Sequence, residues 1–86
     1  MNIYEFADKI NKELIITRYP RQHSRFTADF EYAEVKEGGM LASLYGEGKD
    51  PFEALNDYAE QITGKTLVFN ASGTERREYL VPELEI

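Results

Sequence analysis

The most concentrated set of reactive side chains in this sequence is a basic stretch between residues 18 and 25. It brings together Arg18, Tyr19, Arg21, His23 and Arg25. Arginine can hold phosphate or carboxylate oxygens through paired hydrogen bonds, and a tyrosine ring offers a face for stacking. The stretch therefore predicts a site for a nucleotide, another phosphorylated molecule or an acidic peptide. The alternative is a solvated loop whose arginines pair with carboxylates of the same chain.

A second basic pair, Arg76-Arg77, occurs near the other end of the sequence. The pair and the basic stretch would share one site if the last strand of the fold lay beside the first. On that hypothesis the ligand-binding residues are Arg18, Tyr19, Arg21, His23, Arg25, Arg76 and Arg77.

Catalytic machinery is not recognisable in the sequence. His23 is the only imidazole, Ser24 is too close to it in sequence to be activated in the usual way, and cysteine is absent. The carboxylates follow no calcium-loop spacing, and Asp29, Glu31 and Glu34 are interpreted as the wet face of a strand. The alternative for this face is an acidic patch that mimics a phosphate backbone and occupies a nucleic-acid-binding protein. We therefore expect a non-enzymatic protein that uses no metal and no cofactor.

The segment Gly46-Glu47-Gly48 precedes a predicted helix. Glycine-rich loops at helix N-termini can hold phosphate with backbone N–H groups. Here Glu47, Asp50 and Glu53 would repel an anion, so a tight turn between strand and helix is the favoured interpretation.

The charge balance bears on partners. Acidic residues outnumber basic ones by 16 to 10, which gives a formal net charge of −6. Nucleic acid repels such a chain, whereas a protein with a basic surface attracts it. The sequence has no membrane-length apolar run, no basic leader and no cysteine. We therefore expect a cytoplasmic protein whose partner is another protein; nucleic acid is the less expected partner.

Two helices must position these residues. Asn2 and Glu5 form a capping box before an apolar stripe that runs from Ile3 to Ile10. Asp50, followed by Pro51, begins a second helix whose buried stripe would hold Leu55, Tyr58, Ala59 and Ile62, and Gly64 would end it.

The remaining segments favour strands. The ranges are Leu14 to Tyr19, Arg25 to Val35, Met40 to Tyr45, Thr66 to Phe69, and Arg77 to Val81 as an additional candidate. In the longest of them Phe26, Ala28, Phe30 and Tyr32 alternate with polar residues, which predicts one buried face and one wet face. Near Ala33 and Val35 the alternation changes phase, which indicates a twist or bulge. Gly38-Gly39 supplies the following hairpin turn, and the tail 83–86 is expected to fray.

These elements predict a single α+β domain over residues 1–86. Its antiparallel sheet would have four or five strands with two helices on one face, in the order α-β-β-β-α-β or α-β-β-β-α-β-β. An open sheet edge favours pairing of two copies into a homodimer.

The segment Gly48 to Leu55 resembles the helix entry of HicB-type antitoxin domains, with a glycine, a capping residue two positions on and then Glu-Ala. The preceding hairpin, Arg25 to Tyr45, suits the same fold. The order α-β-β-β-α also resembles double-stranded-RNA-binding domains, but the lysine cluster of that family is reduced here to Lys49 among acids. The small, acidic, cysteine-free chain is similar in composition to accessory proteins encoded by phages.

These resemblances imply a small inhibitor or antitoxin-like protein-interaction module of bacterial or phage origin. The alternatives are a nucleotide-binding domain that uses the arginines and an RNA-binding domain.

Overall fold

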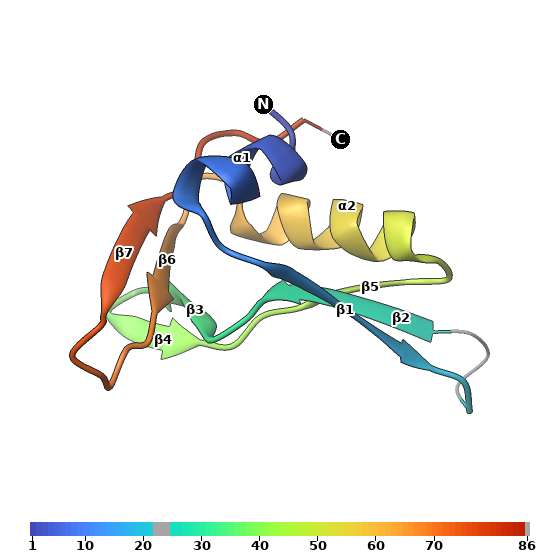
Figure 1. Cartoon of the computed structure of the whole chain (residues 1–86), viewed down its shortest axis with the longest axis horizontal. Helices are drawn as coiled ribbons and strands as arrows, with labels where there is room; N and C mark the ends of the chain where they lie inside the picture. The colour runs from blue at the N-terminus through green and yellow to red at the C-terminus, as the bar shows by residue number, and fades with distance from the viewer. Residues whose placement is uncertain (22–24, 86) are drawn as a thin grey trace.

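The computed structural model describes residues 1–21 and 25–85, and it contains two layers of structure (Figure 1). Over these residues the order is α1 (Ile3–Ile10), β1 (Leu14–Tyr19), β2 (Arg25–Phe30), β3 (Ala33–Glu37), β4 (Met40–Ala42), β5 (Gly46–Gly48), α2 (Pro51–Ile62), β6 (Thr66–Phe69) and β7 (Arg77–Leu80). The predicted α+β class of a single small domain is confirmed.

The strands form two antiparallel sheets, where one sheet was expected. The first has the order β1-β2-β5 and the second the order β4-β3-β6-β7. The division arises because the predicted strand from Arg25 to Val35 is interrupted by a turn at Glu31-Tyr32. Tyr32 has a φ of 61°, in the left-handed region, so the chain changes direction there and β3 enters the second sheet. Tyr32 is consequently 74% exposed and does not lie on the buried face as its alternation with Phe30 predicted.

The return strand is divided in the same way. The range Met40 to Tyr45 was expected to be one strand, but only β4 pairs with β3. The chain then crosses to the first sheet, where β5 pairs with β2 in a segment expected to be a loop. The connection from β2 to β3 and the connection from β4 to β5 therefore both pass between the two sheets.

Both helices lie on one side of the sheets, as predicted, and enclose an aromatic core (Figure 1). Phe30 is at its centre, with ring centroids 6.1 Å from Phe6, 5.9 Å from Tyr58 and 5.7 Å from Phe69. The edge-to-face angles of these pairs suit the charge distribution of aromatic rings. The core thus joins α1, α2 and both sheets.

The helix ends follow the local sequence. Asn2 and Glu5 form the predicted capping box, and the Asp50 side chain accepts a hydrogen bond from the N–H of Glu53. Glu53 in turn accepts from the N–H of Lys49 rather than from that of Asp50. In place of a frayed tail, the structure buries Leu84 and joins the N–H of Glu85 to the carbonyl of Met1.

Candidate functional site

The residues of the basic stretch separate onto two faces of the first sheet. Tyr19 lies opposite Arg25, and Arg18 lies opposite Phe26. Cross-strand partners share a face and successive residues alternate, so Tyr19 and Arg25 lie on the outer face, away from the helices, and Arg18 lies on the helix side. Arg21 follows β1 and is exposed, while His23 falls outside the described residues.

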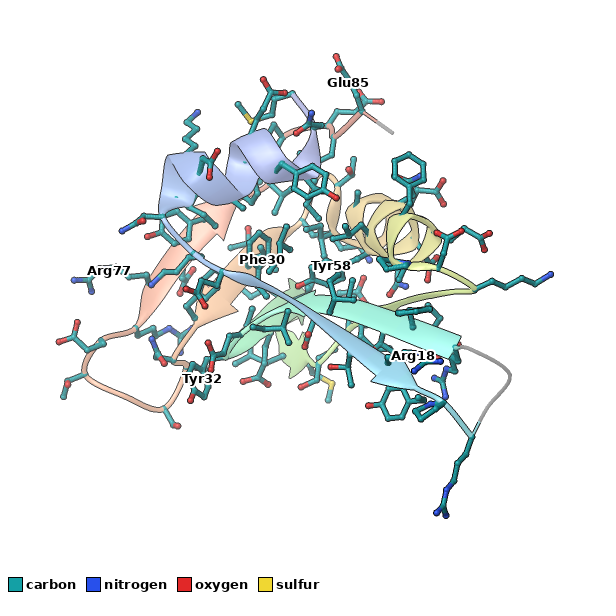
Figure 2. The ribbon with its side chains drawn as sticks, turned by 45° about the vertical axis from the view of Figure 1, so that its right-hand side comes forward. Arg18, Phe30, Tyr32, Tyr58, Arg77 and Glu85 are labelled. Carbon is teal, nitrogen blue, oxygen red and sulfur yellow. The ribbon has the colours of Figure 1, made fainter. Side chains whose placement is uncertain are left out.

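Arg76 and Arg77 lie at the opposite end of the molecule. Figure 2 shows Arg77 and Arg18 at opposite sides of the domain, whose longest extent is 37 Å. The two arginine clusters therefore do not form one site.

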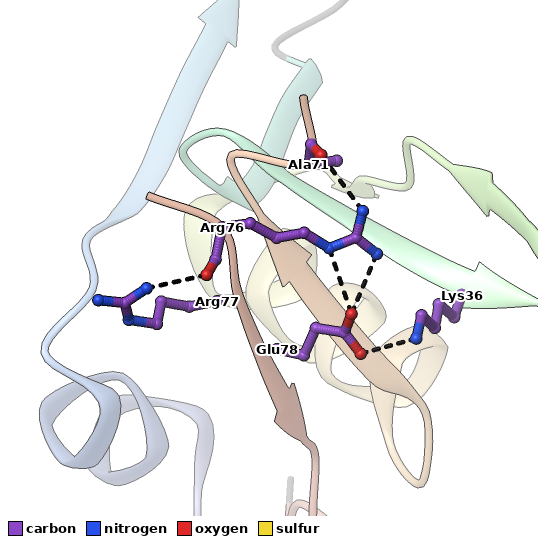
Figure 3. Close-up of polar contacts among 5 residues, drawn as sticks. All are labelled: Lys36, Ala71, Arg76, Arg77 and Glu78. Carbon is purple, nitrogen blue, oxygen red and sulfur yellow. Dashed lines mark hydrogen bonds and ion pairs between the residues drawn. The ribbon is translucent and has the colours of Figure 1, made fainter. Parts of the chain in front are cut away.

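Arg76 is already engaged within the second sheet (Figure 3). Its Nε and Nη2 donate to Glu78 Oε2 at 3.2 and 3.0 Å, and Nη1 donates to the carbonyl of Ala71. Lys36 donates to the other carboxylate oxygen of Glu78 at 2.7 Å, and these two partners lower the pKa of Glu78. The arrangement matches the alternative in which arginines pair with the chain's own carboxylates.

On the outer face, Arg25 lies between two tyrosine rings. Its guanidinium carbon is 5.7 Å from the ring centre of Tyr19 and 6.0 Å from that of Tyr45, and it forms an ion pair with Glu47. The hydrogen bond to Glu47 raises the pKa of Arg25. The pairing of β5 with β2 produces this group, because it places Glu47 opposite Thr27. The Tyr19 and Tyr45 rings are 42% and 47% exposed, so both present apolar surface beside the guanidinium of Arg25.

These side chains border a shallow depression of about 340 Å³ that continues along Thr17, Thr27 and Asp29. A second depression of about 420 Å³ shares Asp29 and extends past Tyr32 and Ser43 to the second sheet. A third, of about 280 Å³, shares Ser43 and Tyr45 with the others. Because neighbouring depressions share residues, they form one concave area where the two sheets diverge. We call this area the junction surface; its charged residues and tyrosines are Tyr19, Arg25, Asp29, Tyr32, Glu34, Tyr45, Glu47 and Asp57.

The junction surface is acidic, since it combines the carboxylates of Asp29, Glu34, Glu47 and Asp57 with the single guanidinium of Arg25. Partial burial raises the pKa of Asp29, so this carboxylate is held in an environment that favours its neutral form. A cationic group brought next to Asp29 would therefore stabilise its charged form.

Tyr32 lies at the centre of the crossing between the sheets. Its carbonyl accepts from the N–H of Asn70 at 3.1 Å, which holds the turn, while its ring is exposed. A left-handed backbone at a non-glycine residue other than asparagine or aspartate is energetically costly, and such conformations concentrate at functional sites.

The segment Gly46-Glu47-Gly48 does not present free donors for a phosphate. The N–H of Glu47 donates to Asp57 at 2.8 Å, and the N–H of Lys49 donates to Glu53 at 3.3 Å. The glycines instead allow close approach of α2, because a Cβ at Gly46 would lie 2.1 Å from the carbonyl oxygen of Ala54. The segment is an edge strand under a helix.

The sequence indicated Tyr19 and Arg25 as one candidate site and Asp29 as part of an acidic strand face, but it did not join Asp29, Tyr32 and Tyr45 to that site in one surface. Tyr45 joins it through the pairing of β5 with β2, for which two glycines in three residues give no strand signal. Only the exposure of some tyrosines at an interface could be anticipated from composition.

No protein-family model, curated protein or solved structure matches this chain. Within residues 1–21 and 25–85, neither helix has the length and apolarity to cross a membrane. Over the same ranges, no three histidine, aspartate or glutamate side chains are grouped for a metal ion.

Proposed function

We propose that this protein is a non-enzymatic binding module that holds a basic surface of a partner protein against the junction surface. The observation that carries the proposal is the group of three exposed tyrosines, Tyr19, Tyr32 and Tyr45, around the concave acidic area of the junction surface. Tyrosine and arginine are the residue types most enriched among the dominant contacts of protein interfaces.

The charge of the site selects the partner's chemistry. The guanidinium of Arg25 is neutralised by Glu47, so the remaining carboxylates of the junction surface set its electrostatic potential. Lysine or arginine side chains of a partner would pair with Asp29 and Glu34, and the net charge of −6 would accelerate their approach. A protein that normally binds nucleic acid has such a surface, and covering it would make this chain an inhibitor of the antitoxin type.

A nucleotide site is the second candidate from the sequence. It would rest on Arg18, Arg21 and Arg25 without the distant pair at 76 and 77, and Arg18 lies on the other face of the sheet from Arg25. The geometry therefore favours the protein-binding function.

Gentle purification of the tagged chain at low salt, followed by native mass spectrometry, tests the proposal. The wild type should carry a stoichiometric basic protein, and Tyr32→Ser combined with Tyr45→Ser should lose it. Tyr4→Ser is the matched control, because Tyr4 is 54% exposed on α1 and lies outside the junction surface. Salt should also weaken binding of the partner, since it screens the pairing of the partner's basic side chains with Asp29 and Glu34.

Retention of the partner by the double variant, with correct folding by circular dichroism, would reject the junction surface. A bound nucleotide or oligonucleotide in place of a protein would instead favour the ligand-binding alternatives.

A further inference from the structure

The first sheet has two edges, and only one of them is closed. At the β5 edge, Gly46 and Gly48 pair with β2 on the inner side. On the outer side the N–H of Glu47 donates to Asp57 of α2, so α2 closes this edge. At the other edge, β1 is six residues long and carries a single charged side chain, Arg18. In Figures 1 and 2, β1 passes in front of β2 and no other element passes in front of β1. An edge of this kind is a template for another strand.

The direction of the backbone groups on β1 follows from one hydrogen bond and from the strand register. The carbonyl of Glu13 accepts from the N–H of Glu31, so Glu13 and the alternate residues Ile15 and Thr17 point toward β2. Strand geometry then directs the N–H and C=O groups of Leu14, Ile16 and Arg18 outward. No described group bonds to these outward amides.

We propose that two copies of this chain pair through their β1 strands, antiparallel, with Ile16 on the two-fold axis. In this register Ile16 faces Ile16 of the second copy, and Leu14 faces Arg18 of the second copy. Every outward backbone group of the strand is then used.

Neighbouring registers are less favourable for reasons visible in the sequence. A register in which each residue pairs two positions further toward the C-terminus of the second copy sets Leu14 opposite Pro20, which has no N–H to donate. A shift toward the N-terminus sets Lys12 directly against Arg18 of the second copy, and like charges at such positions repel. The register centred on Ile16 sets Pro20 opposite Lys12, with both outside β1, and so avoids both problems within the strand.

The side chains on the helix side of β1 support the same occupant. Ile16 is 39% exposed and lines a largely apolar groove of about 470 Å³ with Leu14, Leu55 and Tyr4. Pairing about Ile16 would place the two grooves side by side and remove this apolar surface from water. The outer faces would form one continuous sheet with both junction surfaces on the same side. The inference rests on the β1 edge and is independent of the partner proposed above.

Sedimentation velocity over a concentration series tests the dimer. The wild type should sediment as a dimer, and Ile16→Lys should lose the dimer because two ammonium groups would meet on the axis. Leu80→Lys is the matched control, since Leu80 is 73% exposed on the edge strand β7 and should leave the dimer intact. A monomeric wild type at all concentrations, or a dimeric Ile16→Lys variant, would overturn the inference.

A cross-link tests the register without relying on a destabilising change. The chain has no cysteine, and hydrogen-bonded partners on antiparallel strands have Cα atoms about 5.5 Å apart, within reach of a disulfide. Ile16→Cys should therefore oxidise to a covalent dimer, whereas Leu80→Cys should remain largely monomeric under denaturing conditions. Equal cross-linking of the two variants would reject the register.

Discussion

The buried hydroxyl of Tyr58 accepts a hydrogen bond from the backbone N–H of Phe30 at 3.1 Å. This bond forms where the ladder between β2 and β5 ends, since the last pair is Ala28 with Gly46. A side chain of α2 thus completes the pairing of β2 after the chain has left for the second sheet. Tyr58 is 1% exposed, so neither partner can exchange this bond for one with water.

Replacing Tyr58 by phenylalanine should lower the free energy of unfolding by about 1–3 kcal/mol, because it leaves the N–H of Phe30 buried and unpaired. Urea unfolding followed by circular dichroism measures the change. Tyr32→Phe is the control: its hydroxyl is on an exposed side chain, so it should alter stability by less than about 0.5 kcal/mol. Equal effects of the two variants would contradict the role of this bond.

Alkaline pH should weaken the fold through the same residue. Burial raises the pKa of Tyr58 from 10.0 to about 12, so the folded state favours the neutral phenol. The stabilisation is complete below pH 10 and is lost as the pH rises through about 12. Its size is roughly 2–3 kcal/mol, at about 1.4 kcal/mol for each unit of pKa.

Urea midpoints of the wild type and Tyr58→Phe, measured from about pH 8 to about pH 12.5 to span both pKa values, would isolate the contribution of Tyr58 to stability. The difference between the two proteins should shrink as the pH rises. A difference that stays constant would show that another group controls the alkaline loss.

Gly46→Ala should destabilise the domain by about 1–3 kcal/mol or more, as overpacking of a close contact does. The new Cβ would lie 2.1 Å from the carbonyl oxygen of Ala54 and 2.4 Å from the nitrogen of Tyr58, so α2 would have to move off β5. At Gly73 the nearest atom is 3.6 Å from the corresponding position, so Gly73→Ala should be nearly neutral. Thermal unfolding compares the two; similar melting temperatures would contradict the close packing.

Tyr32→Asn should stabilise the domain by about 1 kcal/mol, because asparagine adopts the left-handed backbone more readily than tyrosine. If Tyr32 is an anchor for a partner, the same change should weaken binding. Tyr45→Asn is the control for stability, since it exchanges the same side chains at another exposed tyrosine, one whose φ is not positive. A gain of stability at both positions would point to the loss of an exposed ring rather than to the backbone.

The local signals in the sequence predicted much of the fold. Asn2 and Asp50 cap helices as their side-chain chemistry indicates, and β1 and β6 occupy the predicted ranges. The change of phase near Ala33 and Val35 indicated a twist or bulge, but the turn at Tyr32 was not predicted, because Tyr32 is in phase with Phe30 and continues the strand pattern. The left-handed conformation is imposed by tertiary structure, through the bond from Asn70 and the pairing of β3 with β6.

The candidate site was predictable only where it is local. Tyr19 and Arg25 face each other because they flank one hairpin, and the basic stretch identified both. Tyr45 and Glu47 reach Arg25 through a three-residue strand that local propensity does not favour. The separation of Arg25 from Arg76 depends on the division into two sheets, which the local sequence pattern does not predict.

The turn at Glu31-Tyr32 also has a consequence for how the chain folds. It separates the hairpin of β1 and β2 from the hairpin of β3 and β4. The first sheet therefore contains one pair of strands that are adjacent in sequence, and the second contains two, β3 with β4 and β6 with β7. Such pairs close short loops and form quickly, whereas the pairing of β3 with β6 joins residues far apart in the chain. The two hairpins can therefore form independently of each other, and the slow step of folding is expected to be the arrival of β6, which unites them around Phe30.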